Sequence, residues 1–131
     1  MRTDTTVTTT VAPAASTEAQ VRHYYDLVDA GDVPGLVSLF TPDAVYHRPG
    51  YPPFDGHEGL TRFYGGTRVI RAGRHTLTTL VAEGSDIAVH GEFHGELHDG
   101  TAVALRFADF FRIAADGRFA RRDTFFFAPL V

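Results

Sequence analysis

Cysteine and tryptophan are absent from the sequence, and its 131 residues include a single methionine. Without cysteine, disulfide cross-links, thiol catalysis and cysteine-ligated zinc are excluded, and the composition fits a reducing compartment. No apolar run reaches the ~20 residues of a membrane-spanning helix, and the N-terminus lacks the apolar core of a signal peptide. We therefore expect a cytoplasmic protein with no membrane partner.

Clusters of positive charge are missing as well. Twelve Lys and Arg residues stand against sixteen Asp and Glu residues, which gives a net charge of −4. Binding to a phosphate backbone needs a positive face, so no nucleic-acid partner is expected. The sequence also contains no glycine-rich phosphate loop and no HExxH motif. We expect no cofactor and no metal, and a small molecule as the substrate.

Hydrophobic residues are plentiful, at 44% of the chain, and 12% of the residues are aromatic. A chain of this length can bury one closed core without disulfides or a structural metal. Residues 1–16 are rich in Thr and Ala and show no periodicity, so we interpret them as a flexible N-terminal tail. Residues 17–131 are predicted to form a single domain.

The first half of this domain shows helical spacing of its apolar residues, and the second half shows strand-like alternation. The first helix is predicted to begin after Ser16 as its N-cap and to stop at Gly31. Helices are predicted at 17–30, 33–40 and 57–67, and strands at 41–47, 75–83, 87–98, 101–114 and 118–128. This order predicts a cone-shaped α+β fold with three N-terminal helices packed on a curved, mostly antiparallel β-sheet.

One predicted strand contains "VHGEFHGELHD", residues 89–99, in which every second side chain is ionisable. The row consists of His90, Glu92, His94, Glu96 and His98. Alternate residues of a strand share one face, so the row forms either a solvent-exposed sheet face or the polar wall of a pocket. The H-x-E-x-H spacing is also geometrically compatible with a metal. The pattern alone leaves these readings open.

Two longer segments resemble a known family. "YYDLVDAGDVPGLVSLFTPDAVYHRPGYPPFDGHEGLTRFY" is similar to its opening helices and first strand, and "ADFFRIAADGRFARRDTFFF" to its closing hairpin. Over about residues 18–128 the chain resembles the nuclear transport factor 2-like superfamily, in its ketosteroid isomerase and SnoaL-like polyketide cyclase branch. The resemblance implies cofactor-independent acid/base proton transfer on a polyketide-like or other oxygenated carbonyl compound of secondary metabolism.

The resemblance also implies an oxyanion hole. Ketosteroid isomerases stabilise the developing negative charge with a Tyr of the first helix and a protonated Asp of the sheet. Tyr24 and Asp109 match these two positions. At the position of the family's general-base Asp this chain has Arg48, which together with Tyr46 is expected to orient the substrate.

Acid/base roles are implied for three other residues. SnoaL-like enzymes use an acidic residue near the end of the sheet, and Asp123 matches it, with Glu92 and His94 expected as a second proton-handling pair. In the family register these side chains point into the cone, next to Asp109. Phe107 and Phe125 share this inward parity and are expected to form apolar walls of the substrate site.

Two alternative functions remain at this stage. Tyr46 and Asp123 also match positions of limonene epoxide hydrolase-like enzymes, which implies an epoxide hydrolase or an epoxide-opening cyclase. The second alternative is a small-molecule-binding module without chemistry, which would be favoured by pairing of Asp109 and Asp123 with arginines and by the lack of a cavity between helices and sheet. His75, an isolated histidine, is expected to be a surface residue. The outer side chain of Phe126 and the outer sheet face predict a homodimer.

Overall fold

Three α-helices, a π-helical turn and six strands make up residues 14–128, the part of the chain that the computed structural model describes. In chain order they are α1 (Ala14–Ala30), α2 (Val33–Ser38), β1 (Phe40–His47), β2 (Phe54–Asp55), α3 (Gly56–Arg62), the π-helical turn (Phe63–Thr67), β3 (Ile70–Glu83), β4 (Asp86–Leu97), β5 (Ala102–Ile113) and β6 (Phe119–Phe127). This order confirms the predicted α+β fold. None of the described helices is long and apolar enough to cross a membrane.

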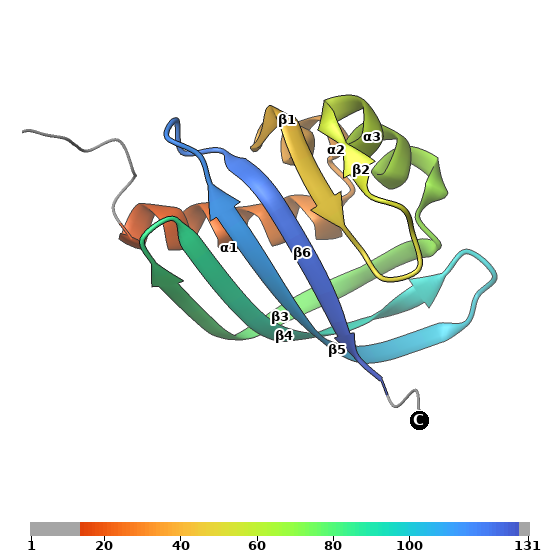
Figure 1. Cartoon of the computed structure of the whole chain (residues 1–131). Coiled ribbons are helices and arrows are strands. Elements are labelled where there is room, and N and C mark those ends of the chain that lie inside the picture. Colours follow the sequence, from red (N-terminus) through yellow and green to blue (C-terminus); the bar gives the residue numbers. More distant parts are fainter. Residues whose placement is uncertain (1–13, 129–131) are drawn as a thin grey trace, which may run out of the picture.

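The strands form one sheet in the order β2-β1-β6-β5-β4-β3. All neighbouring pairs are antiparallel except β1 and β6, which run parallel. Figure 1 shows that the sheet is strongly curved, with α1 lying across one of its faces and α2 and α3 beside β1 and β2. The face toward α1 is called the inner face below, and the opposite one the outer face.

Most element boundaries differ from the prediction by one or two residues; β2 was not predicted, residues 63–67 form a π-helical turn instead of α-helix, and the starts of α1 and β3 differ most. α1 begins at Ala14, so the predicted N-cap at Ser16 is wrong; residues 1–13 of the predicted tail lie outside the described residues. β3 begins at Ile70, five residues before the predicted start at His75. Its first residues alternate poorly because Gly73 stands at an inner position, where an added Cβ would come within 2.3 Å of the Phe93 ring.

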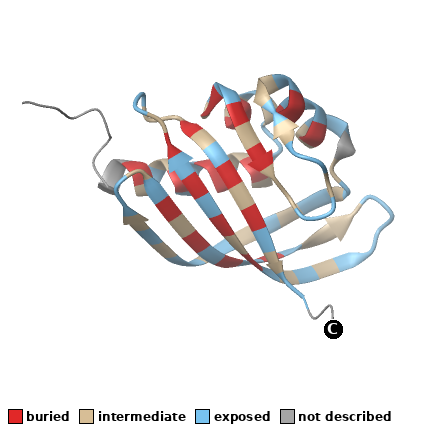
Figure 2. Cartoon of the chain, viewed as in Figure 1, coloured by how far each residue is buried: buried red, intermediate tan, exposed pale blue. Residues whose placement is uncertain are grey.

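Aromatic rings fill the core between α1 and the inner face. Figure 2 shows the burial as stripes across neighbouring strands, which is the alternation expected of a sheet with one covered face. The largest fully buried side chains are Tyr24, Tyr46, Phe40, Phe63, Phe111, Phe119, Leu36, Leu60, Ile87, Val21 and Asp109. A single aspartate in this apolar group marks where the core becomes polar.

A β-bulge in β6 changes which of its residues face inward. Ile113 pairs with Phe119, but Arg112 pairs with Arg121, so one extra residue lies in β6 between these pairs. An extra residue shifts the alternation by one position. Phe119 is buried, and after the bulge the even-numbered residues Arg122 and Thr124 are the buried ones.

Candidate functional site

A narrow pocket opens on the inner face between α1, the π-helical turn and the strands β3 to β6. Twelve residues line it: Val28, Arg48, Tyr64, Arg68, Ile70, His75, Phe93, Leu105, Phe107, Arg122, Thr124 and Phe126. The volume open to the centre of a water molecule is about 20 Å³, room for little more than one water. The inner pocket therefore accommodates one functional group of a ligand at a time.

A wider hollow adjoins this pocket and shares Val28, Tyr64, Arg68, Ile70 and Phe93 with it. Its volume open to water centres is about 370 Å³, and it extends along the end of α1 and the start of β3. Because Tyr64 and Arg68 belong to both spaces, they form the boundary between them. The body of a ligand fits the wider hollow while its reactive group reaches the inner pocket.

His75 and Asp29 form a dyad at the inner pocket. His75 Nδ1 lies 2.6 Å from Asp29 Oδ1, and the backbone N–H of His75 donates to Asp29 Oδ2 at 2.9 Å. Asp29 comes from the last turn of α1 and His75 from β3, so helix packing on the sheet creates the pair. The imidazole also packs against the rings of Phe93 and Phe107, with centroids at 4.8 and 5.4 Å.

The dyad holds His75 as a neutral base. A carboxylate only accepts hydrogen bonds, so the proton of the neutral imidazole sits on Nδ1, facing Asp29, and Nε2 carries the free lone pair. Burial lowers the pKa of His75, and although the Asp29 hydrogen bond opposes this, the net shift is below the usual value. Nε2 has no partner among residues 14–128, so it is the atom available to a ligand.

Arg122 is buried behind the pocket, with 3% of its surface exposed. Its Nη2 donates to Asp109 Oδ2 at 2.8 Å, and Nη1 donates to the hydroxyls of Tyr24 and Tyr64 at 2.5 and 2.7 Å. Burial by itself lowers the pKa of Arg122, but the Asp109 carboxylate and the tyrosines raise it, and the net shift is well above the usual range. The pocket therefore carries a permanent positive charge at its inner wall.

The hydroxyls of Tyr24 and Tyr64 lie 2.5 Å apart, and burial decides which one donates. Tyr24 is fully buried, so its hydrogen would have no acceptor if Tyr64 donated to it. Tyr24 therefore donates to Tyr64, and the Tyr64 hydrogen is free to point into the pocket that this residue lines. Burial raises the pKa of Tyr24 well above its usual value, which keeps this hydroxyl protonated.

Asp109 supports this network without reaching the pocket. It is fully buried, as its inward position predicts, and it accepts hydrogen bonds from Arg122, Tyr25 and Thr124. Asp109 is the acceptor in all three bonds and is not among the residues that line the pocket, so it is not placed to donate to a substrate oxygen as expected. The reason is that Arg122 and Thr124, which do line the pocket, already bind its two oxygens.

Other predicted residues reach the same region. Phe107 lines the pocket, and Arg48 lines it too, donating from Nη1 to the hydroxyl of the buried Tyr46 at 3.0 Å. Tyr24 does not line the pocket, but its hydroxyl is hydrogen-bonded to Tyr64, which does. These residues were predicted near one site, and the fold brings them there.

Asp123 and Phe125 lie on the outer face, so their predicted inward position is wrong. Asp123 accepts from Arg121 at 3.0 Å and lies 2.8 Å from His47 Nδ1, and Phe125 is 55% exposed. Strict alternation from the buried Phe119 would place both inside, but the bulge shifts the parity by one. Phe126, predicted to be an outer residue, lines the pocket for the same reason.

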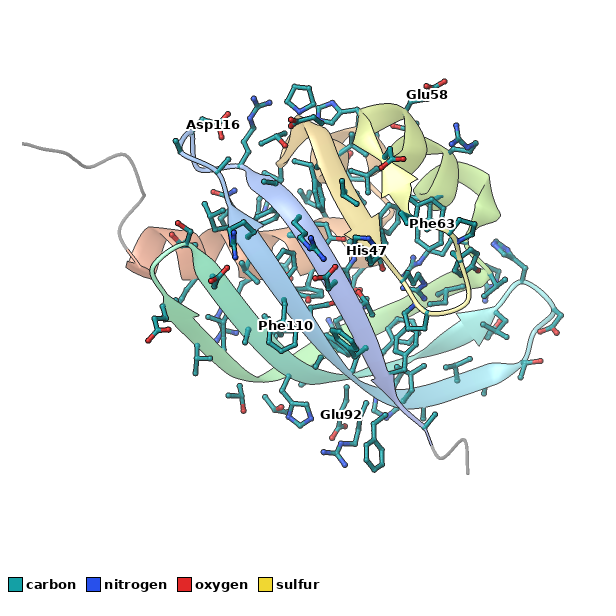
Figure 3. The ribbon with its side chains drawn as sticks, viewed as in Figure 1. His47, Glu58, Phe63, Glu92, Phe110 and Asp116 are labelled. Carbon is teal, nitrogen blue, oxygen red and sulfur yellow. The ribbon has the colours of Figure 1, made fainter. Side chains whose placement is uncertain are left out.

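Glu92 and His94 are exposed on the outer face, so their predicted role in the pocket wall is also wrong. Figure 3 shows Glu92 on the same face as Phe110, away from α1. The odd-numbered residues of β4 decide this orientation: Val89, Gly91 and Phe93 are buried, so the even-numbered residues face outward. Among residues 14–128, no group of three His, Asp or Glu side chains is placed to hold a metal.

Sequence reasoning missed the residues that make the site polar. His75, predicted to be a surface residue, has only 9% of its side chain exposed, and Asp29, Tyr64, Arg68 and Arg122 had no assigned role. Arg122 lies on β6, the strand that pairs with β5, which carries Asp109. This neighbourhood was the signal that could have indicated Arg122. His75 and Asp29 are 46 positions apart, and no local pattern connects them.

Solved structures share this fold. An NTF2-like protein of unknown function from Burkholderia pseudomallei superposes with a TM-score of 0.76 at 22% identity, covering 85% of this chain and 90% of that one. SalBIII, an epoxide hydrolase/cyclase-like enzyme with a role in pyran ring formation in the polyether salinomycin, gives 0.77 at 19% identity, covering 86% and 92%. TerC, co-crystallised with polyporic acid, gives 0.74 at 22% identity, covering 85% and 91%.

A family model extends this likeness from the fold to the sequence. The model of the SnoaL-like domain matches residues 21–122, which include the second half of α1, the π-helical turn and most of the sheet. The matched range also contains both members of the His75–Asp29 dyad and every pocket residue except Thr124 and Phe126. The chain therefore belongs to the SnoaL-like domain family.

Proposed function

We propose that the protein is a cofactor-independent isomerase or cyclase that moves protons on an oxygenated carbonyl compound, with His75 as the general base. One observation carries the proposal: a neutral imidazole, oriented by a carboxylate, lines the same narrow pocket as a hydroxyl donor backed by a buried guanidinium. General acid/base catalysis on a carbonyl compound needs these groups together.

In the first step His75 Nε2 takes a proton from the carbon next to the carbonyl. The C–H electrons move into the carbonyl, whose oxygen becomes negative, and the positive charge on the imidazole is stabilised by Asp29 at 2.6 Å. Burial lowers the pKa of His75, so the base stays neutral and able to accept a proton near neutral pH.

The negative oxygen accepts the free hydrogen of Tyr64. Arg122 donates to that hydroxyl at 2.7 Å, and its positive charge stabilises the negative oxygen of the transition state through Tyr64. The imidazolium then returns its proton to another carbon, which completes an isomerisation. In a cyclisation, the enolate carbon attacks a second carbonyl and the imidazolium protonates the new alkoxide.

The comparisons support an enzyme of this chemical class. SalBIII is described as epoxide hydrolase/cyclase-like, and TerC was co-crystallised with polyporic acid. The family match supports a cyclase or isomerase over the unrelated functions that this fold also hosts.

The test is solvent deuterium exchange. We would incubate the protein in D₂O with a panel of hydroxylated 1,3-diketones and follow loss of the α-proton signal by NMR. Wild-type protein should accelerate the exchange, and His75→Gln should slow it at least about 100-fold. Asp123→Asn, which alters a carboxylate on the outer face, should match the wild type within about twofold; the reverse ranking of these two variants would reject the proposal.

A second candidate is a binding module without chemistry. It is favoured by the pairing of both predicted catalytic aspartates with arginines, Asp109 with Arg122 and Asp123 with Arg121. Ligand binding without any exchange above the uncatalysed rate would select this candidate. If the protein opened an epoxide substrate and the product contained ¹⁸O from labelled water, the hydrolase would be selected instead.

A further inference from the structure

The inner pocket carries three guanidinium groups and no acidic side chain among its described lining residues. The charge of Arg122 is balanced by Asp109 at 2.8 Å. Arg48 and Arg68 have no such partner: within residues 14–128 neither of them forms an ion pair. The pocket therefore holds two positive charges that the protein itself does not neutralise.

The surroundings of these two arginines are aromatic. The Arg48 guanidinium lies over the rings of Phe63 and Phe126, at 5.2 and 5.0 Å, and Arg68 lies over Tyr64 at 5.4 Å. Ring faces hold a cation in place but leave its N–H groups free for a ligand. Arg48 uses one N–H on Tyr46, at 3.0 Å.

Arg68 has a buried donor without a hydrogen-bond partner among the described residues, as Arg122 also does. The atom is Nε in both side chains. Burial lowers the pKa of Arg68, and although Tyr64 opposes this shift, the neighbouring Arg48 cation lowers the pKa further. Two like charges in a partly buried space are unfavourable unless an anion joins them.

We propose that Arg48 and Arg68 bind a carboxylate of the substrate, so that the substrate is an oxo acid rather than a neutral ketone. A planar guanidinium matches the two oxygens of a carboxylate, and Arg68 lies at the boundary between the inner pocket and the wider hollow. The carboxylate at this boundary would direct the carbonyl group toward Tyr64 and His75. The inference rests on the proposed function only in naming the substrate of that site.

Binding can be tested without turnover. We would titrate the protein, labelled with ¹⁵N-arginine, with 2-naphthoate and with its neutral counterpart 2-naphthamide, following the arginine Nε–H resonances by NMR and the affinity by calorimetry. 2-Naphthoate should shift the Arg68 resonance and bind at least about tenfold more tightly than the amide. Arg68→Gln and Arg48→Gln should each weaken 2-naphthoate binding about tenfold or more.

The matched control is Arg112→Gln, which removes the same charge from the outer face, where Arg112 pairs with Asp86. It should leave 2-naphthoate binding unchanged. If Arg68→Gln fails to fold, Arg68→Lys keeps the charge but loses the planar fork and should still weaken binding. Equal affinities for acid and amide, or an Arg68 resonance that stays unmoved by formate, acetate, benzoate and 2-naphthoate, would overturn the inference.

The two proposals fail separately. His75→Gln should slow proton exchange at least about 100-fold and should keep the preference for 2-naphthoate over 2-naphthamide, because that preference depends on the two guanidinium charges. Tight, acid-selective binding by a protein that catalyses no exchange would preserve the carboxylate site and reject the enzyme. Proton exchange on neutral diketones, together with equal binding of acid and amide, would support the enzyme and reject the carboxylate site.

Discussion

The two faces of β4 carry opposite chemistry on neighbouring residues. The inner face presents Gly91 and Phe93, and the outer face presents Glu92 and His94. The conspicuous charges lie in solvent, whereas the inconspicuous glycine allows β3 and the Phe107 ring to pack closely: a Cβ on Gly91 would come within 2.4 Å of the Thr76 carbonyl oxygen and 3.0 Å of that ring. Charged side chains gather where water solvates them, and the two that are buried within residues 14–128, Asp109 and Arg122, form an ion pair.

The carboxylates of the two faces should differ most in stability. Asp109→Ala leaves the buried Arg122 unpaired and should lower the free energy of unfolding by about 3–5 kcal/mol. Asp123→Ala, on the outer face with exposed partners, should cost no more than about 1 kcal/mol. Urea unfolding followed by circular dichroism measures both.

A double variant checks the cause of that loss. Asp109→Leu combined with Arg122→Met removes both charges and should recover most of the stability, because an apolar pair needs no neutralisation. If the double variant is as unstable as Asp109→Ala, packing rather than charge explains the effect.

Tyr64 and Tyr51 test the hydroxyl that we assign to the oxyanion. Tyr64→Phe should lower the exchange rate roughly 100-fold, because it removes one donor to the developing charge. Tyr51→Phe is the control, since Tyr51 packs on Phe54 and Phe63 outside the pocket lining. Comparable rates for the two variants would argue against a donor role for Tyr64.

The pH dependence distinguishes the buried His75 from an exposed histidine. Because its pKa is lowered from the ordinary 6.5, the base stays neutral to lower pH, and the acid limb of kcat/KM should lie below 6.5. Stability follows the same sign: as the pH falls below 6.5 the unfolded chain binds this proton first, so the folded state loses stability until its own pKa is reached. His75→Gln should remove both effects.

The outer face should also mediate dimerisation. It exposes Phe110 at 49% and Phe127 at 69%, flanked by charges of both signs, and two copies of such a face can complement each other. Phe110→Ser should raise the dimer dissociation constant about tenfold. Val69, 50% exposed but outside β4, β5 and β6, gives the control Val69→Ser. A monomer at all concentrations in analytical ultracentrifugation contradicts this prediction.

Fold and site differed in how far they could be predicted. Helical spacing and alternation are local, so the helices, the sheet and the aromatic core followed from the residues themselves. The inward position of Asp109 was predicted correctly, because β5 pairs with β4 without a bulge and the alternation of its side chains is therefore regular. The inward position predicted for Asp123 failed because one extra residue in β6 reverses every later side chain, and a run such as "ARRDTFFF" contains no alternation that would reveal it.

The sequence by itself determined the fold class, because helical spacing and strand alternation are local, and it indicated the family through the resemblance of its opening and closing segments. The tertiary structure decided which ionisable groups meet. The packing of α1 on β3 brings His75 into contact with Asp29, and the register of β5 and β6 brings Arg122 into contact with Asp109. Chemistry depends on distances of about 3 Å between residues far apart in the chain, and only the packed fold sets such distances.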